Sequence, residues 1–324
     1  MEWHPTRFFH HSNKSPYALI ILNQPINENA FVILRKHASL VVCADGGANR
    51  YYDLMKAHGR ESIDLPDAVI GDLDSIKSTT RSHYERLRVP VIQDPDQYST
   101  DFTKCLKHLR DWYYHGGLNG DDSASIDIKD GSGDKYNNRT LEILILGGLG
   151  GRVDQAFSQI HHLTTFSMKW SGIHTSTTIE SESAPKTDAN DNNNGNGNNT
   201  DLKLNLYLIS EESITFILHP GKNIIHTPGT NRPLEEEERK KNKNNNNNQE
   251  YFLEENVGII PYLGPTRITT HGFEWDVTHW PTQIGGQIST SNHIRADVVE
   301  VDCEASVLFT LELATRFKFW GNGR

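Results

Sequence analysis

The chain has 324 residues, an apolar fraction of 35% and a formal net charge of −10. Its length allows two domains and is too great for one small core. An acidic balance with no stripe of lysine and arginine argues against nucleic acid as the main partner, although a metal ion could bridge carboxylates to a phosphorylated small molecule.

Short apolar segments alternate with helical patterns through the first half of the chain. The segments are rich in β-branched residues and nearly continuous in apolar character, which is typical of strands buried on both faces of a parallel sheet. They span 17–22, 40–44, 67–70, 89–92 and 141–146. Helical periodicity begins at Asp101 and again near Arg152. This alternation predicts a doubly wound, Rossmann-like α/β domain.

The pattern changes in the second half, where polar and apolar residues alternate. Strands with one solvated face predict an all-β sandwich, most simply an antiparallel one. These segments span 202–209, 213–218, 267–277 and 297–313, and the end of the last one also fits a helix. We predict an α/β domain over 1–212 and a β-sandwich over 213–324, although 202–209 fits either side of that boundary.

Three polar tracts interrupt these patterns, at 119–139, 181–200 and 235–249. The first is rich in glycine and aspartate but lacks the residue spacing of a calcium-binding loop. The other two are low-complexity tracts, which cannot bury enough apolar surface to form a core. We expect all three to be loops.

The cysteines and apolar runs indicate a cytoplasmic protein. Cys43, Cys105 and Cys303 lie far apart and form no C-x-x-C pair, which is typical of a reducing compartment. The first 16 residues lack an apolar stretch of signal-peptide length, and no apolar run approaches the ~18 residues of a membrane-spanning helix. We therefore expect no membrane partner.

Four of the predicted parallel strands run into loops rich in glycine or aspartate. In chain order these loops carry Asp45 to Asn49, Asp72 with Asp74, the stretch that ends at Asp101, and Arg152 with Asp154. The carboxyl ends of parallel strands lie along one edge of a sheet, where ligands bind. The four loops are therefore expected to form one site.

The residue types in these loops favour chemistry on phosphate. Asp72 and Asp74 would share a face of an extended chain, and paired carboxylates suit Mg²⁺. Glycine lets backbone N–H groups approach an anion, and the residues before Asp101 open a helix whose free N–H groups offer a further anion site. Lys104 and Arg152 can neutralise phosphate oxygens, although Lys104 fits a solvated helical charge equally well. The combination predicts metal-assisted phosphoryl or nucleotidyl transfer.

Several other enzyme classes are excluded by their missing motifs. The chain has no G-x-x-x-x-G-K-[ST] of a P-loop, no G-x-S-x-G elbow and no H-E-x-x-H. His161 and His162 follow the last loop on a predicted helix, where we expect structural or solvated side chains.

The motifs, in their order, resemble the thiamine pyrophosphokinase family, in a fungal-type form. The first half carries "ILNQP" at 21–25, "CADGGANR" at 43–50, "GDLDSI" at 71–76, "PDQYSTDFTKCL" at 95–106 and "GGLGGRVDQ" at 147–155. The second half carries "TTHGFEWDV" at 269–277 and "GGQISTSNHI" at 285–294. The resemblance covers nearly the whole chain apart from the polar tracts and the first dozen residues.

The resemblance implies an α/β nucleotide domain, a β-sandwich and a homodimer with active sites between subunits. It also implies the reaction: ATP and thiamine give thiamine diphosphate and AMP, with Mg²⁺. The implied catalytic and metal-binding residues are Asp72, Asp74 and Asp101. The nucleotide-binding residues that the loops and the resemblance together predict are Asp45, Gly46, Gly47, Asn49, Gln97, Thr100, Lys104, Arg152 and Asp154. The implied thiamine-binding residues are Trp275, Ser289, Thr290, Ser291 and Asn292.

One position departs from the family pattern, since Tyr98 stands where an acidic or other polar residue is common. Two alternatives stay open beside the pyrophosphokinase. One is another Mg²⁺-dependent kinase or nucleotide hydrolase that uses the same acidic edge. The other is a non-catalytic sensor of thiamine or nucleotide.

Overall fold

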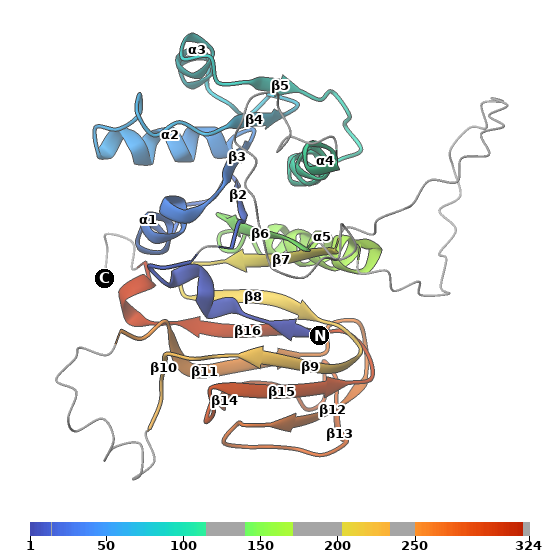
Figure 1. The fold of residues 1–324 in the computed structure, drawn as a ribbon. Helices are drawn as coiled ribbons and strands as arrows, with labels where there is room; N and C mark the ends of the chain where they lie inside the picture. The colour runs from blue at the N-terminus through green and yellow to red at the C-terminus, as the bar shows by residue number, and fades with distance from the viewer. Residues whose placement is uncertain (14, 115–139, 171–202, 234–249, 320–324) are drawn as a thin grey trace, which may run out of the picture.

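The computed structural model describes residues 1–13, 15–114, 140–170, 203–233 and 250–319 (Figure 1). The tracts 119–139, 181–200 and 235–249, which we predict to be loops, lie outside these ranges. Within them, no helix is both long and apolar enough to cross a membrane.

The first half forms a six-stranded parallel sheet in the order β7-β6-β2-β3-β4-β5. Its strands are β2 (Ala18–Ile21), β3 (Leu40–Ala44), β4 (Ala68–Gly71), β5 (Val91–Gln93), β6 (Thr140–Leu146) and β7 (Lys203–Ile209). The helices are α1 (Glu28–His37), α2 (Gly47–Ala57), α3 (Ser78–Arg86), α4 (Asp101–Tyr114) and α5 (Val153–Trp170). The predicted parallel α/β sheet is confirmed.

These strands are apolar throughout because both of their faces are buried. In β2, Leu19 and Ile21 belong to one hydrophobic core and Ile20 to a second core on the opposite face of the sheet. Helices α4 and α5 contact the strands from the side of the second core, and Phe102, Leu106 and neighbouring side chains of α4 fill it. Side chains that alternate along one strand therefore serve two different layers.

The second half is a β-sandwich. Its strands are β8 (Ser213–Leu218), β9 (Gly221–His226), β10 (Thr230–Asn231), β11 (Leu253–Ile260), β12 (Thr266–His271), β13 (Trp280–Thr282), β14 (Ser289–His293), β15 (Val298–Cys303) and β16 (Val307–Leu313). One layer continues the parallel sheet through β8, β16 and β11, with β14 and β10 beside β11. The other layer has the order β1-β9-β15-β12-β13, where β1 is the segment Glu2–Trp3. The predicted sandwich is confirmed, and the segment 297–313 forms two strands, not a helix.

The two halves share one sheet, joined at the hairpin between β7 and β8. Strand β7 runs parallel to β6, so the segment that fitted either half lies with the parallel strands. Strand β8 is antiparallel to β7, and the two are paired only at Leu208↔Thr215 and Ile209↔Ile214. Asn27 at the start of α1 donates hydrogen bonds to the carbonyl oxygens of Ser210 (2.9 Å) and Glu211 (3.2 Å) in the hairpin turn.

The first residues of the chain lie with the sandwich, which corrects their predicted place in the α/β domain. Strand β1 (Glu2–Trp3) pairs in parallel with β9, and the short 3₁₀ helix η1 (Pro5–Phe9) follows it. The Trp3 ring packs 4.9 Å from that of Phe216, and the Phe8 ring lies 5.0 Å from that of Tyr207, measured between centroids. A second 3₁₀ helix, η2 (Thr315–Phe317), follows the last strand, and the Phe317 ring lies 4.8 Å from that of Phe9. Periodicity could not reveal a two-residue strand.

Candidate active site

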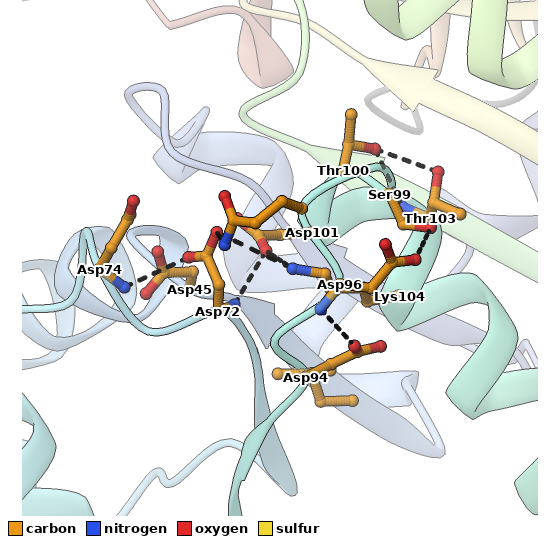
Figure 2. A network of polar contacts seen from close by, with 12 residues as sticks. Asp45, Asp72, Asp74, Asp94, Asp96, Ser99, Thr100, Asp101, Thr103 and Lys104 are labelled. Carbon is orange, nitrogen blue, oxygen red and sulfur yellow. Dashed lines mark hydrogen bonds and ion pairs between the residues drawn. The ribbon is translucent and has the colours of Figure 1, made fainter.

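Three carboxylates meet at the carboxyl edge of the parallel sheet. Asp45 follows β3, Asp72 follows β4 and Asp101 opens α4, and each offers an oxygen within 4.8 Å of the others (Figure 2). The structure thus brings together three of the four predicted loops. Carboxylate oxygens in this number are suited to a hard divalent cation such as Mg²⁺.

Asp45 is held by the loop that follows the neighbouring strand. Its backbone has a positive φ of 37°, and its carboxylate accepts hydrogen bonds from the N–H groups of Ser75 (2.9 Å) and Ile76 (3.0 Å). Burial raises the pKa of Asp45, and the charges of the Asp101 and Asp72 carboxylates raise it further. The carboxylates therefore repel one another, and a bound cation would relieve this repulsion.

Asn49, on the first turns of α2, holds the same loop. Its amide donates to the Ser75 carbonyl oxygen (2.9 Å), and its side-chain oxygen accepts from the Lys77 N–H (3.0 Å). In the structure Asn49 therefore orients the loop that holds Asp45. Its predicted contact with nucleotide stays a prediction.

The pair Asp72 and Asp74 does not lie as an extended chain would place it. Leu73 between them has a φ of 66°, in the left-handed region, so the expectation of a shared face is wrong. The Asp74 N–H donates to Asp72 Oδ1 (3.2 Å), and Asp74 Oδ1 accepts from the Ser75 hydroxyl (2.8 Å). Asp45 takes the third place in the cluster, and a metal-binding role for Asp74 stays a prediction.

Lys104 supplies the positive charge of the site from inside the protein. Its side chain is only 1% exposed, and its Nζ lies 3.2 Å from Asp101 Oδ1 and 3.9 Å from Asp72 Oδ2. The alternative of a solvated helical charge is therefore wrong. Three ionised carboxylates and one ammonium leave a net charge of −2, which one divalent cation would balance.

The loop between β5 and α4 brings a further polar side chain to the acidic edge. Gln97 Nε2 donates to Asp72 Oδ2 (3.3 Å). Asp96 shapes this loop by accepting from the Tyr98 N–H (2.9 Å) and the Ser99 hydroxyl (2.6 Å). The ring of Tyr98, which departs from the family pattern, is fully exposed.

Thr100, the residue before α4, makes its contacts away from the carboxylates. Its hydroxyl lies 3.0 Å from that of Thr103 and 3.2 Å from Nε2 of His162 on α5. Burial lowers the pKa of His162, in agreement with a structural role for this residue. A contact of Thr100 with nucleotide stays a prediction.

The glycines of the first loop are required for close packing. A Cβ on Gly47 would lie 2.1 Å from the Ile21 carbonyl oxygen, and one on Gly46 would lie 2.4 Å from Asn23 Nδ2. At Gly71 a Cβ would lie 2.6 Å from that of Asp45 and 3.0 Å from Asp101 Oδ1. A larger residue at Gly71 would therefore displace Asp45 and Asp101.

Arg152 and Asp154 are paired with each other on the surface. Arg152 Nε and Nη2 donate to the two carboxylate oxygens of Asp154, at 3.1 and 2.5 Å, and both side chains are exposed. The pairing lowers the pKa of Asp154 and raises that of Arg152. Their contact with nucleotide stays a prediction.

A second candidate site lies on the sandwich. A cavity of about 320 Å³ opens between β11, β12 and β14, and all five residues implied to bind thiamine line it: Trp275, Ser289, Thr290, Ser291 and Asn292. The prediction missed Trp280 and Ile288, which line the same cavity. The aromatic character of "EWDVTHW" was a signal for a pocket with two indoles.

Asn292 fixes the backbone of Trp275, one of the aromatic residues that line the cavity. This asparagine is buried, accepts from the Trp275 N–H (3.1 Å) and donates to the Trp275 carbonyl oxygen (3.0 Å). The Trp275 ring stays 53% exposed. The amide of Asn292 therefore fixes the backbone of Trp275, from which the exposed indole extends.

The two sites are far apart within one chain. In the continuous sheet, β11 beside the cavity and β4 beside the carboxylates are separated by seven inter-strand steps. At about 4.8 Å a step this amounts to roughly 30 Å. Figure 1 shows β4 at one end of the molecule and β11, β12 and β14 toward the other.

The chain thus joins a parallel α/β sheet with an acidic edge to a β-sandwich with an aromatic pocket. Two family models match the chain: "Thiamin pyrophosphokinase, catalytic domain" over residues 31–174 and "Thiamin pyrophosphokinase, vitamin B1 binding domain" over 243–308. The chain belongs to the thiamin pyrophosphokinase family and is an enzyme of that kind.

Relatives along the whole chain agree. The thiamine pyrophosphokinase of Saccharomyces cerevisiae is 28% identical, over 91% of this chain and 85% of its own length. Thiamine pyrophosphokinase 1 of Arabidopsis thaliana is 26% identical, over 93% and 88%. The solved structure of thiamin pyrophosphokinase from Candida albicans has the same fold, with a TM-score of 0.68, 22% identity and coverage of 97% of this chain and 93% of that one.

Proposed function

We propose that this enzyme transfers the pyrophosphoryl group of ATP to the hydroxyl group of thiamine, with Mg²⁺, and releases AMP and thiamine diphosphate. The observation that carries the proposal is the meeting of Asp45, Asp72 and Asp101 around the buried ammonium of Lys104, in a chain of this family. Such an arrangement binds a cation and a polyphosphate at the edge of the sheet.

On the nucleotide side, Asp45, Asp72 and Asp101 would hold Mg²⁺, which when bound supplies positive charge to the phosphate oxygens. Lys104 limits the repulsion between the carboxylates and fixes Asp101. Gln97 orients Asp72 from the other side. A carboxylate of this edge accepts the proton that the attacking hydroxyl loses. Most of the rate enhancement comes from positioning and charge neutralisation, since phosphoryl transfer requires little covalent chemistry from the protein.

On the thiamine side, the exposed face of Trp275 offers a flat, electron-rich surface to a cationic ring. The hydroxyl groups of Ser289, Thr290 and Ser291 can bond the polar edge of the pyrimidine. Asn292 holds Trp275 in place and is a positioning residue.

A homodimer with shared active sites is part of the proposal. Reacting atoms must approach to about 3–3.5 Å, whereas the carboxylates and the aromatic cavity of one chain are roughly 30 Å apart. A second copy that places its cavity against the acidic edge of the first would close this gap, and two-fold symmetry would complete both sites.

We also propose a cytoplasmic location. Cys43, Cys105 and Cys303 are free thiols and all three are buried. Burial raises the pKa of Cys303 to about 12, so this thiol is protonated and inert in a reducing compartment. Cell fractionation with an antibody against the protein tests this location.

The decisive experiment is product analysis of the purified protein with ATP, Mg²⁺ and thiamine. We expect AMP and thiamine diphosphate in equal amounts, and neither product without thiamine or with excess EDTA. Formation of ADP, or hydrolysis that needs no thiamine, would instead identify another kinase or hydrolase. Thiamine binding without any turnover would identify a sensor.

A further inference from the structure

A cluster of two histidines and one glutamate lies on the sandwich, outside both sites described above. Strand β1 pairs in parallel with the edge of β9, with Glu2 opposite Ile224 and Trp3 opposite Ile225. Continuing this register by one residue places His4 beside His226. Because residues two apart on a strand share a face, Glu2 lies on the same side as His4.

The three side chains offer ligand atoms that all lie within 4.8 Å of one another. The imidazole rings of His4 and His226 are stacked, with centroids 4.2 Å apart and an interplanar angle of 16°. His4 Nε2 lies 4.0 Å from Glu2 Oε2. Nε2 of His226 is shielded from water and has no hydrogen-bond partner in the described part of the chain.

From this cluster we propose that Glu2, His4 and His226 form a binding site for a divalent cation of the zinc type. Two imidazoles and one carboxylate are ligands that Zn²⁺ prefers, whereas Mg²⁺ prefers an all-oxygen set. A fourth position stays open to water. The site is thus chemically distinct from the acidic edge and is independent of the proposed activity.

Metal binding requires that one imidazole turns out of the stack, because the in-plane lone pairs of two rings inclined at only 16° do not converge on one ion. Ligands about 2.0–2.1 Å from a tetrahedral zinc ion lie roughly 3.3–3.5 Å from each other, so the 4.0 Å between His4 and Glu2 must shorten slightly. The Glu2 side chain is 65% exposed and free to make that movement.

A metal ion here would fasten the first strand to the sandwich. Trp3, between Glu2 and His4, points to the opposite face and is buried in the core, where its indole N–H donates to Asn223 Oδ1 (3.1 Å). Zinc binding would therefore hold this tryptophan in place and raise the melting temperature in proportion to the logarithm of the Zn²⁺ concentration.

The test is calorimetric titration of the chelator-treated full chain with Zn²⁺, in millimolar-range Mg²⁺ that occupies the carboxylates of the acidic edge. We expect one Zn²⁺ per chain, bound with an affinity that falls at least ~10-fold on His4→Ala. His11→Ala is the matched control, because His11 lies on the same surface segment and pairs with Glu250 at 3.6 Å. This control should leave the affinity unchanged.

Two further variants distinguish a loss of zinc binding from a loss of folding. Glu2→Gln preserves the shape of an exposed side chain and should also weaken zinc binding, whereas His226→Gln should abolish the zinc-dependent rise in melting temperature. Zinc affinity that is equal in wild type, His4→Ala and Glu2→Gln would overturn the proposal. Absence of binding by the wild-type chain would overturn it as well.

Discussion

At the scale of single residues, Lys104 explains how three carboxylates can crowd together. Its side chain extends from α4 and is 1% exposed, and its ammonium contacts both Asp72 and Asp101. A buried charge is tolerated only when it is paired, so the lysine and the carboxylates depend on each other. The charge of −2 that remains is one that a single divalent cation would balance.

Asp101→Asn should lower turnover by several orders of magnitude and leave the fold intact. The amide keeps the size of the side chain and can still accept hydrogen bonds from Lys104 and from the Asp72 N–H, but it removes one negative charge from the cation site. The measurement is the rate of AMP formation, with circular dichroism as the check on folding.

Asp53→Asn is the matched control for that change. Asp53 lies on α2 with an exposed side chain and pairs with Lys77 at 3.6 Å, away from the carboxylate cluster. Its turnover should equal that of the wild type. A near-normal rate for Asp101→Asn would remove the basis for a metal site at this edge.

At the scale of elements, the contact between α2 and β2 depends on Gly47. A Cβ at this position would lie 2.1 Å from the Ile21 carbonyl oxygen, and a strand in the middle of the sheet cannot move away. We expect Gly47→Ala to destabilise the fold by at least about 3 kcal/mol, at the upper end of overpacking effects. Urea denaturation measures the loss.

Gly258→Ala in β11 provides the comparison. The nearest atoms to a Cβ there are 3.8–4.0 Å away, at ordinary contact distance. Its free energy of unfolding should stay close to that of the wild type. Equal stability of the two variants would show that the helix can shift to admit a methyl group at Gly47.

The turn between β8 and β9 makes stability depend on pH. His219 is buried there beside the Trp3 ring, its Nδ1 has no hydrogen-bond partner in the described part of the chain, and burial lowers its pKa to about 4. The pKa of His219 in the folded state is below the ordinary value of 6.5, so the unfolded chain binds the proton more readily. The contribution of neutral His219 to the free energy of unfolding is therefore complete above pH 6.5 and is lost as the pH falls toward 4. The loss approaches about 3 kcal/mol.

His219→Phe keeps a flat ring beside Trp3 and removes the titration. We expect its free energy of unfolding to fall less than that of the wild type between pH 6.5 and pH 4. Chemical denaturation across this range gives both curves. Parallel curves would mean that the imidazole becomes protonated without cost, for example by reaching water.

At the scale of the whole molecule, a shared active site predicts complementation between two inactive variants. Asp101→Asn disables the acidic edge and Trp275→Ala disables the aromatic cavity. In a mixed dimer, one of the two shared sites combines an intact acidic edge with an intact aromatic cavity. Equal mixing makes about half of all dimers mixed, so about a quarter of the wild-type activity should return. The variants must be mixed under conditions that let subunits exchange. An inactive mixture of dimers that do exchange would place both halves of the site in one chain.

The layers of the fold and the acidic edge followed from local patterns, since strands such as 17–22 are apolar on both faces and their carboxyl ends must share an edge. The place of Asp74 did not follow, because the left-handed backbone of Leu73 has no signature in its residue type. The burial of the Lys104 side chain could not be predicted from the sequence pattern either. It stands at the border of the apolar face of α4, beside Cys105, where spacing alone fits either environment.

The single sheet that runs through both halves sets how the chain can be divided. The N-terminal β1 completes a layer of the sandwich, β7 and β8 share a hairpin, and α5 contacts both of these strands. A cut at the hairpin would leave each fragment without side chains that its own core requires. The two halves therefore cannot be exchanged as independent domains. A chimaera made with a relative must take β1 from the same protein as the sandwich that this strand completes.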